Sequence, residues 1–139
     1  MASSNYIYQL CDTFGTLYQS TPPTVTFDGQ KYNNAYIYKG WFRNSKGIGS
    51  AIQSTDTYGV YGNTTIYQIF EPNEYTLTFN SNGGTEIESI TNKFDTTVAI
   101  PIPKKEGKTF DGWYYDDKFT KRFSGNIPPL NSTLYAKWK

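Results

Sequence analysis

The clearest alternation of apolar and polar positions lies at residues 75–79, which read Tyr-Thr-Leu-Thr-Phe. Successive side chains of a strand point to opposite faces, so this alternation predicts a half-buried strand with its three apolar residues on one face. The Asn- and Gly-rich segment 80–84 is typical of a turn. A second apolar run at 134–138 predicts a closing strand.

The pattern between these two strands is less regular. Ile87, Ile90 and Phe94 have helical spacing, while a strand returning along 75–79 is the alternative for residues 86–94. Residues 98–103 are apolar and contain two prolines, which suits an irregular or one-turn helical crossover. This part of the pattern leaves helix and strand open.

Two sequence elements occur twice in the same order. The first joins an aromatic residue, Gly-Trp and another aromatic residue, at 38–42 and at 110–114. The second joins Asn, Ser or Thr, Thr, an aliphatic residue and Tyr to a final aromatic residue, at 63–70 and at 131–138. The Gly-Trp pairs are 72 residues apart and the Asn residues 68 apart, so the loop of the first copy is four residues longer. This duplication predicts two tandem repeats.

The expected boundary lies at Glu71-Pro72-Asn73-Glu74, because proline interrupts sheet hydrogen bonding. The predicted modules are therefore 1–71 and 72–139, with the same strand order. In the first module, residues 6–10 are a candidate first strand and 24–27 a candidate further strand. The Asn-Gly-Gly turn of the second module has no counterpart there.

Composition supports a mainly β fold within the α+β class. Aromatic residues make up 18% of the chain, with 13 Tyr, 9 Phe and 3 Trp. Aromatic and β-branched residues favour sheets, and Asn and Gly favour turns. Because each ring buries a large area, a few rings can hold a small module together.

Charge and residue usage argue against several function classes. The net charge of +1 provides no basic field for nucleic acid, and no stretch is long enough to be inserted in a membrane. Histidine is absent, and Cys11 is the single cysteine. The commonest general base and metal ligand are therefore missing. We expect no catalytic residues, no metal and no cofactor.

The pieces of the second module resemble a known family. They are the strand at 75–79, the Ser-Asn-Gly-Gly turn at 81–84, the proline-rich crossover at 101–103, Lys-x-Gly-x-x-Phe-x-Gly-Trp-Tyr at 105–114 and Leu-Tyr-Ala-Lys-Trp at 134–138. This order is similar to that of the internalin B-repeat, also called the Listeria–Bacteroides repeat. The resemblance covers residues 74–138, and residues 1–71 share only the Gly-Trp and Asn-Thr elements.

The resemblance implies small β-grasp-like modules strung in arrays on exported bacterial proteins, as spacers or adhesion segments without catalytic activity. The expected location is extracellular, at the bacterial cell surface or secreted. The expected partners are neighbouring repeats or domains of a longer parent chain. Host or cell-wall glycans, or a surface protein, are further candidates.

The Gly-Trp pairs have two interpretations. They could be platforms on which a ligand stacks, but in a small module an indole is more often part of the core. The expected structural anchors combine these pairs with aromatic residues of the closing strands: Gly40, Trp41, Tyr67, Gly112, Trp113, Tyr135 and Trp138.

Two further motifs favour structural interpretations. Asn63 and Asn131 match the glycosylation pattern, but both precede a closing strand, where an Asn turn is expected. Asp116 and Asp117 could bind calcium, but their spacing is not that of a calcium loop. A solvated hairpin tip is the favoured interpretation.

The leading functional hypothesis is a non-catalytic spacer or adhesion segment. The alternative is a carbohydrate- or protein-binding adhesin module that uses exposed tyrosines of the first repeat, with Tyr58 and Tyr61 as the best candidates. A small hydrolase is disfavoured because no nucleophile and base can be paired. A contiguous patch of exposed rings would favour binding, and buried rings would favour the spacer.

Overall fold

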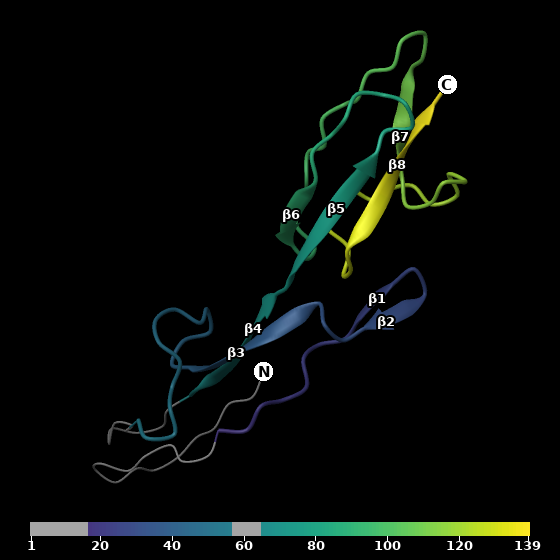
Figure 1. Cartoon of the computed structure of the whole chain (residues 1–139). Helices are drawn as coiled ribbons and strands as arrows, with labels where there is room; N and C mark the ends of the chain where they lie inside the picture. Colours follow the sequence, from purple (N-terminus) through teal and green to yellow (C-terminus); the bar gives the residue numbers. More distant parts are fainter. Residues whose placement is uncertain (1–16, 57–64) are drawn as a thin grey trace. The chain divides into compact units, whose positions relative to one another are not determined.

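The computed structural model describes residues 17–56 and 65–139, and the mainly β prediction is confirmed in this part of the chain. All regular elements described there are strands (Figure 1). They are β1 (Val25–Phe27), β2 (Gln30–Tyr32), β3 (Tyr36–Phe42), β4 (Tyr67–Pro72), β5 (Glu74–Asn80), β6 (Ile90–Lys93), β7 (Phe110–Tyr114) and β8 (Ser132–Trp138). The candidate strand at 6–10 lies outside the described residues.

The C-terminal part forms a four-stranded sheet with the order β6-β5-β8-β7. Strands β5 and β8 lie side by side in its centre and run parallel, with Phe79 opposite Leu134 (Figure 1). Strand β6 is antiparallel to β5, and β7 is antiparallel to β8. The ambiguous segment 86–94 therefore contains a returning strand, while a β-grasp-like architecture remains a prediction.

The core of this sheet follows the alternation in the sequence. Tyr75 and Leu77 of β5 are buried on one face, as are Leu134 and Ala136 of β8. Ile127, outside the strands, completes this side of the core with Trp113. Burial of large apolar side chains against each other is the main stabilising contribution expected in so small a unit.

The crossover from β6 to β7 contains no helix between residues 94 and 109. Its backbone is hydrogen-bonded to a distant segment instead. The Asp95 amide donates to the Ile127 carbonyl at 2.9 Å, and the Ile127 amide donates to the Thr96 carbonyl at 2.9 Å. A helix is not needed here, because these bonds satisfy polar backbone groups that would otherwise be left unpaired in the fold.

The N-terminal part has a smaller sheet, in which β3 pairs with β4. Its described core consists of Trp41, Ile52 and Ile66, with Leu17 and Tyr38 packed against them. The Gly-Trp strand thus pairs with the closing strand here, as β7 pairs with β8 in the C-terminal sheet.

Contacts divide the chain into two compact units, and the hairpin formed by β1 and β2 belongs to the second. Among the described residues, the first unit comprises 17–23 and 36–71, and the second comprises 24–35 and 72–139. The boundaries expected from the sequence assign 24–35 to the first module. The difference arises from long-range contacts of the hairpin, and the division into two tandem modules stays a prediction.

Candidate functional site

The Gly-Trp element of β7 is a bulge held by a residue of the following loop. The register of β7 against β8 shifts between Phe110 and Trp113, and Gly112 has a φ of 113°. A Cβ atom at Gly112 would lie 2.6 Å from Nη2 of Arg122. That guanidinium donates hydrogen bonds to the Asp111 carbonyl at 3.2 Å and to the Tyr114 hydroxyl at 3.1 Å. Glycine is favoured here because this φ is strained for other residues, and the guanidinium would have to move to admit a side chain.

The Gly-Trp element of β3 shares two of these features. Gly40 has a φ of 124°, and a Cβ atom there would lie 2.9 Å from Cβ of Ala51. The Ile52 amide donates to the Trp41 carbonyl at 2.7 Å, as the Phe123 amide donates to the Trp113 carbonyl at 2.9 Å. Both elements therefore combine a glycine at positive φ with a loop whose amide donates to the Trp carbonyl.

Both indoles are buried, with exposed fractions of 8% for Trp41 and 7% for Trp113. Trp113 packs edge-on against Phe79 and Phe110, at centroid distances of 5.0 and 5.4 Å. Trp41 donates its Nε1 hydrogen to the Tyr18 carbonyl at 3.1 Å. Rings so enclosed offer little face to a ligand, which supports their predicted role as structural anchors.

Trp138, the last anchor predicted, joins the closing strand to the Asn-Gly-Gly turn. Its Nε1 donates to the Ser81 carbonyl at 2.9 Å, and a Cβ atom at Gly84 would lie 2.5 Å from its ring. Asn82 donates to the Ala136 carbonyl at 2.8 Å, and Lys105 donates to the Asn82 carbonyl at 2.8 Å. Three motifs that are distant in the sequence thus form one structural cluster.

The tyrosines of the closing strands occupy equivalent positions. Tyr67 and Tyr135 are both half-buried, and each is flanked by a buried position on either side. Tyr135 lies opposite Tyr114 in the pairing of β7 with β8. Their contribution as anchors remains a prediction.

Asn131 accepts a hydrogen bond from the Thr76 amide at 2.8 Å through its Oδ1. The side chain therefore ties the entry of β8 to β5, which supports a structural interpretation of this Asn. The sequence pattern suggested only a local turn, because a partner 55 residues away cannot be inferred from neighbouring residues. Asn63 lies outside the described residues.

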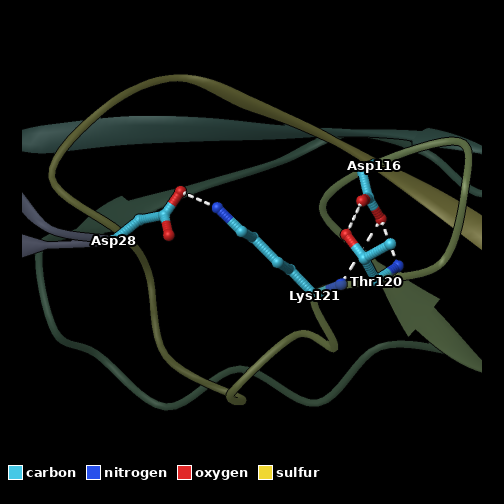
Figure 2. Close-up of polar contacts among 4 residues, drawn as sticks. All are labelled: Asp28, Asp116, Thr120 and Lys121. Atoms are coloured by element: carbon cyan, nitrogen blue, oxygen red, sulfur yellow. Dashed lines mark hydrogen bonds and ion pairs between the residues drawn. The ribbon is translucent and has the colours of Figure 1, made fainter.

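Asp116 holds the loop that follows β7 (Figure 2). Its carboxylate accepts hydrogen bonds from the Thr120 hydroxyl and from the Thr120 amide, the latter at 2.8 Å. The bond from the Thr120 side chain is the main cause that lowers the pKa of Asp116. Within the described ranges, no group of three or more His, Cys, Asp or Glu side chains could hold a metal ion.

The structure reveals one site that the sequence did not, a groove between the 24–35 hairpin and the C-terminal sheet. Phe27 packs edge-on against Tyr115, with ring centroids 5.4 Å apart. Asp28 forms an ion pair with Lys121 (Figure 2). Burial raises the pKa of Tyr115, and Ser124 nearby partly opposes that effect. We call this region the hairpin groove, and its lining includes Phe27, Asp28, Gln30, Tyr32, Tyr115 and Lys121.

Two further contacts fix the hairpin to the second unit. The Tyr75 hydroxyl donates to the Asn34 carbonyl at 2.6 Å, and the Asn73 amide donates to the Ala35 carbonyl at 2.8 Å. Ala35 is completely buried. No local signal in 24–35 could have revealed this docking, because its partners lie about 40 or more residues away.

The predicted partner-binding residues Tyr58 and Tyr61 lie outside the described residues. The large apolar side chains that are well exposed elsewhere are Tyr18, Ile37, Ile48 and Ile102. Only one of these four is aromatic. The described part of the chain therefore shows no broad patch of exposed rings.

Comparison with known proteins identifies the C-terminal module. The sequence profile of the Listeria-Bacteroides repeat domain matches residues 75–137. A protein of Evansella cellulosilytica described as a Gly-rich membrane protein is 32% identical over 107 residues, which cover 75% of this chain and 12% of that protein. Internalin H of Listeria monocytogenes is 30% identical over 107 residues, which cover 74% of this chain and 19% of internalin H.

The chain thus spans less than a fifth of the length of these relatives. Alignments of 107 residues are longer than the matched domain, so the similarity includes part of the chain before residue 75. Among the described residues, no helix is long and apolar enough to cross a membrane. The motifs, the sheet they build and the profile match agree, and residues 75–137 belong to the Listeria-Bacteroides repeat domain family.

Proposed function

We propose that the chain is a non-catalytic spacer segment of an exported bacterial surface protein. The observation that carries this proposal is the use of its aromatic residues. Both described Gly-Trp indoles are buried, and the rings around Trp113 pack against each other. Trp side chains, which are common in binding surfaces, are here buried in the cores of two small units.

The relatives support the same proposal. Their names are those of membrane proteins and of an internalin, and this chain corresponds to a small fraction of each. A short folded segment within a long protein is suited to setting the distance between other parts. Its partners would be the neighbouring repeats or domains, and its location would be extracellular.

A surface-display experiment tests the spacer role. One, two or four copies of the 139-residue chain are placed between a cell-wall anchor and an N-terminal epitope, and binding of antibody-coated beads is measured. Folded units hold a defined length, whereas a Gly/Ser linker collapses to a random coil. We expect bead binding to rise with copy number and to exceed that of linkers with equal residue counts.

The matched control replaces Trp41 and Trp113 by Ala in every copy, which should unfold the units without changing their length in residues. Reduced bead binding by this variant, at equal surface expression, supports a folded spacer. Equal binding by the wild type, the unfolded variant and the Gly/Ser linker would contradict the proposal.

The adhesin alternative stays a prediction, since Tyr58 and Tyr61 lie outside the described residues. Its test is the double substitution of both tyrosines by Ser. Loss of binding to cells or glycans with unchanged thermal stability would support a binding surface. Loss of stability would assign these rings to the core.

A further inference from the structure

The hairpin groove is a composite site, because one of its walls comes from outside the repeat domain. Strands β1 and β2 precede residue 75, whereas Tyr115, Lys121 and the residues after Leu130 belong to the matched domain. The groove has a volume of about 520 Å³. Sites for small ligands commonly have roughly 300–1,000 Å³. An isolated repeat domain would have only half of this site.

Aromatic rings form the apolar part of the groove. Phe27 lies between Tyr32 and Tyr115, with centroid distances of 6.4 and 5.4 Å. All three rings are half-buried, so each retains some exposed surface. Partly exposed rings at fixed angles provide contact area at low entropic cost.

The groove contains one ion pair and one further cation. Asp28 is paired with Lys121, and their side chains are 49% and 53% exposed. Arg122 also lines the groove, and its guanidinium donates to the Asp111 carbonyl and to the Tyr114 hydroxyl, which are both neutral groups. An ionic ligand would have to compete with the pair of Asp28 and Lys121, whereas an uncharged ligand can leave that pair intact.

Uncharged polar groups complete the lining. Gln30, the first residue of β2, is exposed and lines the groove. Ser124, Ser132 and Thr133 also line it, and the Ser132 hydroxyl donates to the Leu130 carbonyl at 3.2 Å. Amides and hydroxyls both donate and accept hydrogen bonds, so they match a ligand that carries hydroxyl groups.

We propose that the hairpin groove binds a short saccharide. Such a ligand combines an apolar C–H face, which can lie on Phe27 and Tyr32, with hydroxyls, which can bond Gln30 and other polar side chains of the lining. This site is separate from the spacer role and goes beyond it, so either can fail without the other.

The test is titration of the full chain with chitotriose, cellotriose and maltotriose, followed by NMR shifts of backbone amides. We expect saturable shifts at 27–32 and 121–133 with at least one of the three sugars. Tyr32→Ala should weaken that binding about three- to tenfold, the range expected from loss of one aromatic contact. Gln30→Ala should weaken it without changing the thermal unfolding of the chain.

The matched control is Tyr18→Ala, which removes an exposed ring outside the groove and leaves its carbonyl bonds possible. It should bind the sugar as the wild type does. Absence of saturable shifts with all three sugars would overturn the proposal. So would equal losses of affinity in Tyr18→Ala and Tyr32→Ala.

Discussion

The two Gly-Trp elements of the chain share a backbone but differ in what surrounds it. Each has a glycine at positive φ, a buried indole and an amide of the returning loop bonded to the Trp carbonyl. Around Trp113 the core includes the rings of Phe79, Phe110 and Phe123. Around Trp41 the described core is smaller, with Ile52 where the other has Phe123.

A polar anchor accompanies this smaller core. The Tyr18 carbonyl accepts hydrogen bonds from Trp41 and from Gln68, which is 3% exposed. At the position of Gln68, the second closing strand has Ala136, which is completely buried. The comparison teaches that the two units share the geometry of the Gly-Trp strand, while different side chains fill the space beside it in each unit. The following substitutions break or sharpen this comparison.

Trp113→Ala should have the largest effect. Removal of a buried large aromatic residue costs about 3–5 kcal/mol, which is comparable to the whole stability of a small unit. We expect the second unit to unfold, as measured by urea denaturation followed by NMR signals of residues 74–80. Trp41→Ala should instead affect signals of 36–42. An unchanged denaturation curve for Trp113→Ala would show that the indole is not an anchor.

Gly40→Ala should destabilise the first unit by about 1–3 kcal/mol, because a side chain is forced into a strained conformation. Its new Cβ also meets Cβ of Ala51, a short side chain that cannot rotate away. Gly112→Ala meets the mobile end of Arg122 instead. We therefore expect the double variant G40A/A51G to recover the part of the stability that is lost through the steric clash, as measured by chemical denaturation. No rescue by A51G would contradict the predicted close approach.

Gln68→Ala should destabilise the first unit by about 1 kcal/mol, since one hydrogen bond to the Tyr18 carbonyl is lost and Trp41 still donates to it. The reverse exchange, Ala136→Gln, introduces a large polar side chain at a completely buried position. It should cost the second unit more, about 1–3 kcal/mol. Thermal unfolding of both variants measures the two losses of stability. Equal losses would mean that the surroundings of Gln68 and of Ala136 do not differ in the way proposed.

The smallest expected effect concerns pH and the loop at Asp116. Hydrogen bonds from Thr120 lower the pKa of Asp116 when the loop is folded. Their contribution is therefore present above the unfolded pKa of about 3.9, and it is lost as the pH falls through the lower folded value. We expect a slight acid loosening of residues 116–121, detected by amide exchange. Asp116→Asn should lack this pH dependence, and an identical acid response would refute the assignment.

Much of the C-terminal sheet could be predicted from its sequence. The alternation at 75–79 correctly placed Tyr75 and Leu77 on the buried face, and the apolar run at 134–138 formed the closing strand. The segment 86–94 could not be assigned from its pattern, since Ile87, Ile90 and Phe94 have helical spacing although a returning strand was the alternative. It forms β6 because the adjacent edge of β5 offers backbone partners.

The candidate sites were less accessible to prediction. Burial of Trp41 and Trp113 follows from the need of small units for large anchors, and it was expected. The hairpin groove was not expected, because no pattern or motif in residues 24–35 predicts that they pack against a segment far away in the sequence. Tyr58 and Tyr61 were predicted as partner-binding residues because glycines keep their loop adaptable and their rings offer contact area, and this role stays a prediction.

By itself, the sequence determined the local structure of this protein: strand faces, turns and the repeated Gly-Trp element. These depend on side-chain alternation and on backbone preferences, which act between near neighbours. The tertiary structure alone decided that the hairpin 24–35 packs with the second unit and that Trp138 covers Gly84. These contacts form because surfaces that are distant in the sequence are complementary in shape and because their buried polar groups can hydrogen-bond to each other. The local sequence pattern cannot predict this complementarity.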